Sequence, residues 1–426
     1  METMALTFKI GTASAAVQIE GDLPRTNWHA WAEKPGSIKD GTSPEPATGH
    51  WKRWREDNAL MQELHLQIAR ISLDWTRIEP RRGQWDETAV ARYREELIDL
   101  KERGIEPLVT LHHFSHPQWF EEMGGFAKEQ NISLFIRFVA KILAEFGDLV
   151  SDWNTINEPN VFATQSFLYN ETPPGGKSWR KALTTMRNFA IAHIRAYKLI
   201  HSTLDAPGRT INVSIAHHIR GFTPLNPKNP VHRAFAKIDD YLYNRLIENA
   251  CYNGNFHPLL GRPPCDIQRG HYCDVVAINY YTRSTVRGLT DGVFPGAPVN
   301  DLGWEIYPQG IVECARELHE RHRLPIWITE NGTADNGSDT ELERFRPKYL
   351  LDHFAAMAAS GLPFERYYHW CFVDNWEWSE GMVPHFGIVH LDPTTLERTP
   401  KPSAYMLRDI IDQGKINDDI YQRYVK

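Results

Sequence analysis

The stretch "DWNTINEPN" at residues 152–160 begins as a half-apolar strand and stops at a carboxylate followed by a proline. A turn after a strand ordinarily uses small residues such as Gly, Asp or Ser, yet Asn157 and Glu158 stand at this end. The stretch "LPIWITENG" at residues 324–332 repeats the pattern, because an apolar run again ends in a glutamate, Glu330, and the strand pattern stops at the following Asn-Gly. Two strands that end in glutamates indicate a pair of functional carboxylates.

Eight short apolar runs alternate with longer stretches of helical periodicity. Helices are expected at 86–104 and 131–147; the first has apolar residues at helical spacing and ends at Gly104. No linker or low-complexity segment interrupts the alternation. The pattern predicts an α/β protein, a single (β/α)8 TIM barrel that occupies residues 1–426 as one catalytic domain. The expected strands are 6–15, 67–75, 106–114, 152–158, 210–218, 274–281, 324–331 and 365–375.

Polar residues lie late in several of these runs, where the strands end in "HHF", "NE", "NYY", "TEN" and "DN". In a parallel barrel, the C-terminal ends of all strands open on one face, and active sites of this fold lie there. We therefore expect Glu158 and Glu330 to meet at one mouth although they are far apart in the chain.

Composition excludes several classes of protein. The chain has 426 residues, of which 42% are hydrophobic, enough for a large core. Its net charge of −7 arises from mixed basic and acidic residues without a basic stripe, so a nucleic-acid partner is not expected. No apolar run is long enough to span a membrane, "METMALTFKIGTASAA" lacks the pattern of a secretory signal, and the five cysteines show no CxxC spacing. We expect a reduced, cytoplasmic, soluble protein, and its oligomeric state stays open.

Two carboxylates that face each other across a cleft suit hydrolysis of a glycosidic bond. One carboxyl group is kept protonated and donates to the leaving oxygen, while the other, ionised, attacks the sugar or activates water. A separation of about 5–5.5 Å gives retention of configuration and about 6.5–9.5 Å gives inversion. Sequence provides no distance, so both outcomes stay open on the residues alone.

Seven motifs also carry a resemblance. "TINEP" (155–159) and "ITENG" (328–332) resemble the acid/base and nucleophile signatures of glycoside hydrolase family 1, the β-glucosidase and β-galactosidase family. The resemblance covers nearly the whole chain, and the other motifs follow in the family's order: "GTASAAVQIEG" (11–21), "ARISLDWTRI" (69–78), "VTLHHF" (109–114), "AINYY" (277–281) and "DNWEWSEG" (374–381).

The resemblance implies a retaining mechanism with assigned roles. Glu158 is then the general acid/base and Glu330 the nucleophile that forms a glycosyl-enzyme, while Asn157 holds the 2-hydroxyl of the sugar. Arg70 and Tyr281 flank Glu330 and favour its ionised form, because a nearby cation and a donated hydrogen bond both lower the pKa of a carboxyl group. Successive strand residues face opposite sides, so Asn157 and Glu158 both serve the cleft only if the strand end is kinked.

The remaining sugar contacts also come from the resemblance. Trp370 is expected beneath the sugar ring, Glu377 on the 4- and 6-hydroxyls, and Trp378 as an indole donor above. The other implied positions are Gln18 and His113 on hydroxyls, Asn279 as support for this shell, and Phe386 at its edge.

Substrate class follows from two of these residues. Relatives that act on 6-phosphorylated sugars replace the carboxylate at Glu377 with small neutral residues, and its negative charge is expected to repel a phosphate. Glu158 stands where plant-type thioglucosidases have glutamine, which argues against that activity. We expect hydrolysis of terminal, non-reducing, unphosphorylated β-D-hexosides, β-glucosides first and β-galactosides or β-fucosides next, without metal or organic cofactor. The natural aglycone and the balance with transglycosylation are left open.

The chain departs from the family pattern at three positions. Phe114 and Ser115 stand where a tryptophan and an aspartate are usual, which keeps an apolar wall but removes an indole N–H. Cys371 replaces a common serine, and the Trp370–Cys371 peptide bond is expected to be cis as in the family.

Two rival hypotheses remain. "HHFSH" (112–116) raises the possibility of a metal-dependent hydrolase that uses His112, His113 and His116, but adjacent strand residues point to opposite faces and do not easily share one ion. A non-catalytic sugar-binding barrel is the second hypothesis, and retention of both glutamates argues against it.

Overall fold

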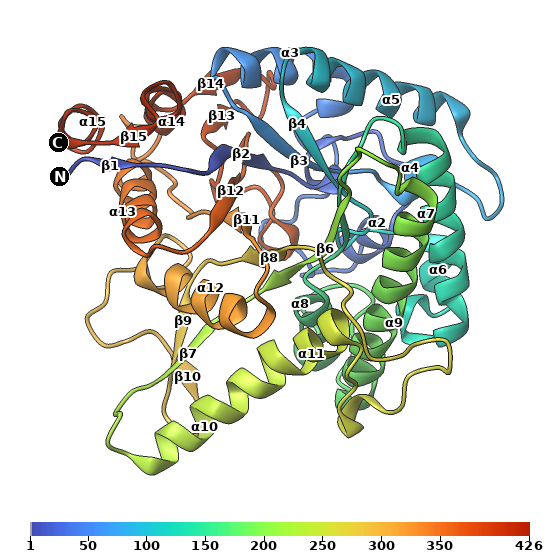
Figure 1. Cartoon of the computed structure of the whole chain (residues 1–426). Coiled ribbons are helices and arrows are strands. Elements are labelled where there is room, and N and C mark those ends of the chain that lie inside the picture. Colours follow the sequence, from blue (N-terminus) through green and yellow to red (C-terminus); the bar gives the residue numbers. More distant parts are fainter. Residues whose placement is uncertain (1) are drawn as a thin grey trace.

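The computed structural model describes residues 2–426 and contains a closed barrel of eight parallel strands. The strands follow one another around the barrel in chain order, each hydrogen-bonded to the next. The predicted TIM barrel is therefore confirmed (Figure 1). Its strands are β2 (Lys9–Ala13), β3 (Ile68–Ser72), β4 (Glu106–Thr110), β5 (Asp152–Asn157), β6 (Asn212–His218), β8 (Val276–Asn279), β11 (Ile326–Asn331) and β12 (Phe364–Trp370).

Each predicted strand overlaps one observed strand, but five of the eight observed strands are four or five residues shorter than expected. Before Lys9, the chain pairs instead with the C-terminal segment, because β1 (Met4–Ala5) is antiparallel to β15 (Lys415–Ile416). After Trp370, the amide of Cys371 donates to the carbonyl of Phe386, so the backbone leaves β2 for another partner. The Trp370–Cys371 bond is cis, as expected.

Amphipathic helices surround the barrel. The helix predicted at 86–104 is observed as α5 (Glu87–Glu102), and the one at 131–147 as α7 (Ile132–Phe146). In α5, the side chain of Asp86 accepts from the amides of Thr88 and Ala89, which caps the first turn. The other long outer helices are α3 (His50–Glu63), α9 (Trp179–Leu204), α11 (Leu246–Asn253), α12 (Gln309–His322), α13 (Arg346–Ala359) and α14 (Pro402–Gln413).

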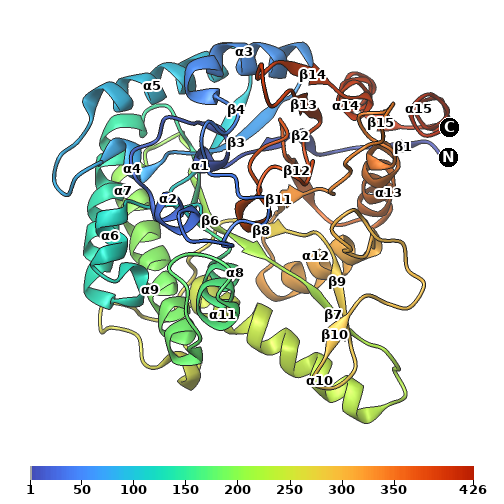
Figure 2. The same cartoon turned by 180° about the vertical axis from the view of Figure 1, so that it is seen from behind.

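Further helices and strands lie outside the eight barrel strands. Figure 2 shows α1, α2 and α8 near the centre of the view. The three-stranded sheet of β7, β9 and β10 and the helix α10 project from one side (Figure 1). The remaining elements are α1 (Ala16–Ile19), α2 (Asn27–Ala32), α4 (Trp75–Ile78), α6 (Gln118–Glu122), α8 (Pro159–Thr164), β7 (Gly221–Pro224), α10 (Pro230–Asp240), β9 (Arg283–Val286), β10 (Asp291–Gly292), β13 (Val389–Leu391), β14 (Arg398–Pro400) and α15 (Asp418–Tyr424).

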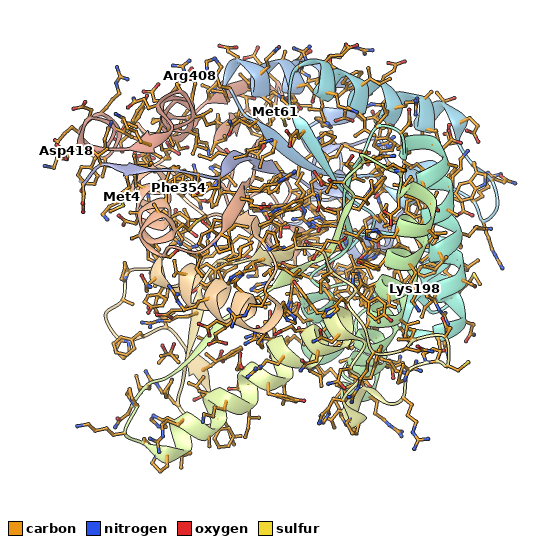
Figure 3. The ribbon with its side chains drawn as sticks, in the orientation of Figure 1. Met4, Met61, Lys198, Phe354, Arg408 and Asp418 are labelled. Carbon is orange, nitrogen blue, oxygen red and sulfur yellow. The ribbon has the colours of Figure 1, made fainter. Side chains whose placement is uncertain are left out.

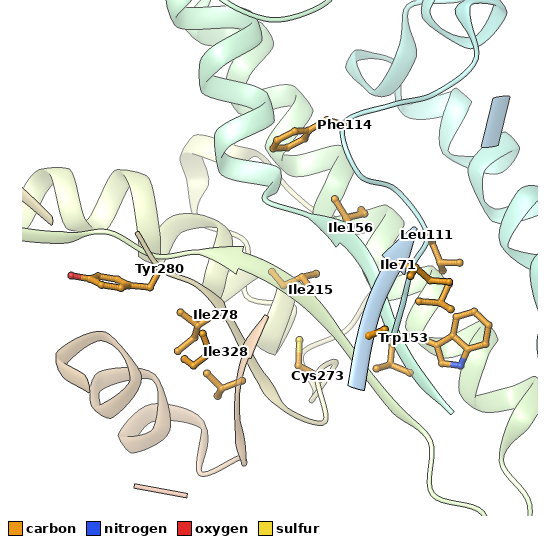
Figure 4. Close-up of a cluster of buried hydrophobic side chains, with 14 of the residues drawn as sticks. Ile71, Leu111, Phe114, Trp153, Ile156, Ile215, Cys273, Ile278, Tyr280 and Ile328 are labelled. Atoms are coloured by element: carbon orange, nitrogen blue, oxygen red, sulfur yellow. The ribbon is translucent and has the colours of Figure 1, made fainter. Parts of the chain in front are cut away.

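The main core lies between the barrel and the helices. Alternate strand residues face outward, so Ile328 joins this layer while its neighbour Trp327 packs inside the barrel. Figure 4 shows Ile278, Ile328 and Trp153 within the outer layer. On α13, Phe354 (labelled in Figure 3) packs edge-on against Phe8, with ring centroids 5.6 Å apart.

All five cysteines are free. Within residues 2–426, no helix combines the length and the apolar character that crossing a membrane requires.

Candidate active site

A cleft of about 190 Å³ opens at the C-terminal ends of the barrel strands. Glu158 and Glu330 both line it, as the barrel predicted. Three residues from the expected set lie behind this lining and contact it: Gln18, Arg70 and Asn279. The expected residues in the lining itself are His113, Asn157, Glu158, Tyr281, Glu330, Trp370, Glu377, Trp378 and Phe386.

Glu158 joins the end of β5 to the start of α8 in a left-handed conformation, with φ of 43°. Non-glycine residues rarely adopt this region. The next residue, Pro159, begins α8, where its fixed φ suits the first helical position. The left-handed residue breaks the strand alternation, and this is why Asn157 and Glu158 both reach the cleft. The kink expected from the sequence is thus confirmed.

Glu158 is buried and receives donors on one oxygen. Asn279 Nδ2 donates to Oε1 at 2.8 Å, and Nδ1 of His218 lies 3.4 Å from the same atom. Burial favours the neutral form of the carboxyl group, but the charge and hydrogen bond of His218, with the Asn279 donor, outweigh it and lower the pKa of Glu158.

Glu330 is held on both oxygens. Arg70 donates to Oε1, and the phenolic O–H of Tyr281 donates to Oε2 at 2.7 Å. The predicted flanking contacts are therefore present. In the open cleft, however, burial and the charge of Glu158 outweigh both donors and raise the pKa of Glu330 to about 7. Arg70 and Tyr281 each lower the pKa of Glu330, as expected, but their combined effect is smaller than that of burial and the like charge.

Arg70 fixes the floor of the site. It is fully buried, and its Nη2 donates to Oδ1 of Asn157 at 2.6 Å. Asn157 in turn donates through Nδ2 to Nε2 of His113 at 3.0 Å, and Asn279 Nδ2 lies 3.0 Å from Asn157 Oδ1. A buried network in which each member has a partner sets the orientation of the side chains at the cleft.

Close packing also explains Gly332, two residues after Glu330. A Cβ atom built at Gly332 would lie 2.0 Å from the carbonyl oxygen of Trp370. Only glycine lets the two strand ends, β11 and β12, approach this closely.

Glu377 lines the same cleft as Glu158 and Glu330. Trp370 Nε1 donates to its Oε1 at 3.1 Å, and Gln18 Nε2 lies 3.3 Å from its Oε2. Burial, with the charge of Glu330, raises the pKa of Glu377 to about 8. The raised pKa favours the protonated form of the carboxyl group near neutral pH, so the repulsion of a phosphate expected from the charge of Glu377 stays a prediction.

Gln18 is placed beneath Glu377 rather than in the cleft lining. Its Nε2 donates to the carbonyl of Trp376 at 2.7 Å, while its buried Oε1 has no partner in the protein. Its direct contacts orient the Glu377 carboxyl group.

Aromatic rings form the walls. Trp378 packs on Trp28, with ring centroids 4.8 Å apart, and on His113 at 5.9 Å. Phe114 meets Trp378 edge-on at 5.2 Å, so it keeps the apolar wall at the position where the family usually has tryptophan. On the other side, Phe386 contacts Tyr281 at 6.2 Å.

The three histidines of "HHFSH" do not converge. His113 faces the cleft, whereas Nε2 of His112 bonds Nδ1 of His116 at 3.2 Å behind it. Nε2 of His116 continues to Glu121 at 2.7 Å. The opposite facing of adjacent strand residues, expected from the sequence, is confirmed.

Sequence reasoning missed several residues of the cleft. His218, at the end of β6, lies 3.4 Å from Glu158, and the "HH" that closes the predicted strand 210–218 was a signal of the same kind as "NE" and "TEN". Arg220, Tyr243 and Trp304 also line the cleft. These three come from loops and an added helix, where no periodicity marks them.

Comparisons with known proteins agree with this geometry. A family model described as glycosyl hydrolase family 1 matches residues 1–262 and 271–416. β-Glucosidase A of Thermotoga maritima is 29% identical over 441 residues, which cover 96% of this chain and 98% of that protein. A β-galactosidase of Saccharolobus solfataricus is 28% identical over 485 residues, which cover 97% of this chain and 96% of that protein.

Solved structures give the same result. A β-glucosidase from Thermotoga maritima in complex with glucoimidazole superposes with a TM-score of 0.91 at 28% identity, covering 98% of this chain and 100% of that one. A β-glycosidase from Pyrococcus horikoshii gives 0.87 at 30% identity, with 99% and 98% covered. The family match over nearly the whole chain, together with two carboxylates at the mouth of one barrel, shows that this protein belongs to glycosyl hydrolase family 1 and is an O-glycosyl hydrolase, a β-glycosidase.

Proposed function

We propose that the protein is a retaining β-glucosidase. It hydrolyses terminal, non-reducing, unphosphorylated β-D-hexosides, with β-glucosides preferred and β-galactosides and β-fucosides as further substrates. The observation that carries the proposal is the Glu330 carboxylate, held by Arg70 and Tyr281 in the same cleft as Glu158. A carboxylate fixed on both oxygens is oriented for attack on a carbon.

The reaction proceeds in two displacements. Glu330 attacks the anomeric carbon, and the glycosidic bond breaks as Glu158 gives its proton to the departing oxygen, so that the aglycone leaves as an alcohol. Glu158, now ionised, removes a proton from a water molecule that attacks the same carbon. The ester bond to Glu330 breaks, the sugar leaves with its original configuration, and both carboxyl groups return to their starting states. An alcohol in place of that water gives transglycosylation.

The productive state has the proton on Glu158 and the negative charge on Glu330. In the cleft the directions are reversed, because the pKa of Glu158 is lowered while burial and the charge of Glu158 raise the pKa of Glu330. Protonation of Glu158 removes the charge that raises the pKa of Glu330, and Arg70 and Tyr281 then favour ionised Glu330. Movement of one proton within the pair therefore produces the reactive state without any change in total charge.

Sugar recognition is assigned to Glu377 and Asn157, which line the same cleft. Glu377, oriented by Trp370 and Gln18, binds the 4- and 6-hydroxyls, and Asn157 binds the 2-hydroxyl. Among the described residues that line the cleft, Arg220 is the one lysine or arginine, and it lies beyond Glu158 in the groove described below. A 6-phosphate near Glu377 finds no lysine or arginine there, which supports an unphosphorylated hexose.

We also propose that the chain acts as one catalytic domain and works in the cytoplasm. The closed barrel includes strands from both ends of the chain, and residue 1 of the proposed 1–426 domain lies outside the described residues. Five unpaired cysteines are consistent with a reducing compartment.

Proton NMR of a reaction with an aryl β-glucoside tests the mechanism. Retention gives β-glucose as the first product, followed by slow mutarotation, and a first product with the α configuration would contradict it. Rates of nitrophenol release from aryl β-glucoside, β-galactoside and β-fucoside rank the sugars. Sugar binding without turnover on all three would favour the non-catalytic barrel.

A further inference from the structure

A second hollow, of about 490 Å³, adjoins the catalytic cleft. We call it the lateral groove and define it by Leu168, Trp179, Leu183, Met186, Phe222 and Leu242. These residues come from the segment after α8, the first turns of α9, strand β7 and the segment after α10. Figure 1 shows α10 and the β7–β9–β10 sheet extending from the barrel beside α8, α9 and α11.

The lateral groove and the cleft share part of their lining. Gln165, Arg220 and Tyr243 belong to both. A continuous path of rings joins them, because Tyr243 meets His218 edge-on at 5.8 Å and Phe222 at 5.8 Å on its other side. The Arg220 guanidinium lies 5.7 Å from the centre of the Tyr243 ring.

The position of this junction decides which part of a substrate can enter the groove. Glu158 is the proton donor to the leaving oxygen in the proposed mechanism, and His218 is its neighbour at 3.4 Å. The path to the groove starts at His218, on the acid side of the cleft. Glu377 and Trp370, assigned to the sugar, lie elsewhere in the cleft and are absent from the groove lining. The groove thus continues in the direction of the aglycone.

The surface of the groove is apolar and exposed. Trp179 is 63% exposed and Tyr169 61%, and Leu289 at the rim is 91% exposed. Single exposed apolar residues are ordinary, but a contiguous set that borders a polar site marks a binding surface. The charged groups at the groove are Asp239, Asp291 and Arg220, so no cluster of cations is present to hold an anionic group.

We propose that the lateral groove binds an apolar aglycone, and that the substrates of this protein include β-glycosides of long alkyl chains. This inference rests on the proposed function, because it places the leaving group beyond Glu158. Bound in this way, the sugar occupies the polar cleft, the ring of Tyr243 covers the first part of the chain, and Trp179 and Leu242 cover the rest. Burial of methylene groups then contributes to binding in both the ground state and the transition state.

A series of methyl, butyl, hexyl and octyl β-D-glucopyranosides, each below its micelle concentration, tests the proposal. The value of kcat/KM is expected to rise with chain length, by up to about fourfold for each methylene group that becomes fully buried. Equal values of kcat/KM across the series would overturn the proposal that the groove binds the alkyl chain. Turnover of the methyl glucoside would still support the proposed function.

Two variants locate the effect. The measured quantity is kcat/KM for the octyl glucoside divided by kcat/KM for the methyl glucoside. Trp179→Ala and Leu242→Ser, combined in one protein, are expected to lower this ratio by about tenfold. Tyr405→Ala on α14 is the matched control, since it also removes a partly exposed aromatic side chain, 37% exposed, outside the cleft and the groove. An unchanged ratio in folded groove variants, or an equal fall in the control, would contradict the proposal.

Binding gives a readout that does not need turnover. Calorimetry with hydrolysis-resistant octyl and methyl β-D-thioglucopyranosides is expected to show tighter binding of the octyl compound, and weaker binding of it to Trp179→Ala. If the wild type cleaves no glycoside but binds the octyl compound more tightly than the methyl compound, the proposed hydrolysis is contradicted and alkyl-chain binding in the lateral groove is still supported. A wild-type dimer that Leu242→Ser converts to a monomer, with no octyl preference in either, would assign the surface to a second copy of this chain and overturn the inference.

Discussion

Tyr281 donates its phenolic O–H to Oε2 of Glu330 across 2.7 Å. This hydrogen bond lowers the pKa of Glu330 against the effect of burial. In Tyr281→Phe the pKa of Glu330 is expected to rise, so a higher pH is needed to ionise the proposed nucleophile. The acid limb of kcat/KM should move up by about half to one pH unit, the equivalent of one hydrogen bond of about 1 kcal/mol. Rates from pH 4 to 9 (roughly the range that spans both limbs) measure the shift, and an unmoved acid limb would contradict it.

Glu330→Gln should lower kcat on aryl β-glucosides by roughly three orders of magnitude or more, because an amide does not form the glycosyl-enzyme. Nitrophenol release measures the rate, and a melting curve checks the fold. Glu317→Gln, at a mostly exposed position on α12, serves as control and should keep the wild-type rate. Equal rates in Glu330→Gln and wild type would remove Glu330 from the nucleophile role.

His218→Asn should move the alkaline limb of kcat/KM to higher pH, by about one unit. The charge and hydrogen bond of His218 lower the pKa of Glu158, so their loss raises it and the acid keeps its proton to higher pH. The adjacent His217 offers a control: burial lowers its pKa to about 3, so it is neutral at neutral pH. His217→Asn should leave the alkaline limb unmoved. A downward shift in His218→Asn would show that Glu158 is not the proton donor.

Glu377→Gln should lower kcat/KM on β-glucosides by about 10- to 100-fold, through loss of hydrogen bonds to two hydroxyl groups. The loss should be smaller on β-fucosides, since fucose has no 6-hydroxyl. Parallel assays with the two aryl glycosides measure the difference. Identical losses on both sugars would place Glu377 away from the 6-hydroxyl.

Folding stability should fall at alkaline pH because of a buried histidine far from the cleft. Burial opposes the charged form of His50, but Glu96 and Asp57, 2.9 and 2.7 Å from its two ring nitrogens, outweigh it and raise its pKa to about 9. The unfolded value is about 6.5. The folded protein therefore holds the extra proton between these values, and the stabilisation is complete below pH 6.5 and lost as pH rises through 9.

The loss amounts to about 3 kcal/mol at most. Thermal unfolding at pH 7 and pH 9.5 (roughly half a unit above the folded value) should show a lower Tm at the higher pH. His50→Gln removes the titrating group, so its Tm should be lower at pH 7 and should change less between the two pH values. An equal Tm change in both proteins would assign the pH dependence to other groups.

Much of the fold could be read from the order of apolar runs. Buried parallel strands are short and apolar, and amphipathic helices have their own period, so the alternation was visible without any contact information. The strand ends were less predictable. The chain before Lys9 pairs with β15, at the other end of the chain, and the chain after Trp370 pairs with Phe386 in a loop that no periodicity marks.

The sequence by itself determined the candidates for the catalytic residues. Glu158, Glu330 and their motif neighbours stand at strand ends, and the closed barrel brings strand ends together whatever their separation in the chain. It could not determine the protonation of the pair, because the pKa values of Glu158 and Glu330 depend on burial, on His218 and on each other. Nor could it reveal the lateral groove, whose apolar residues come from separate segments that only the tertiary structure brings side by side. Chemistry at strand ends is a local property of the chain, whereas charge state and hollow surfaces are properties of the packed molecule.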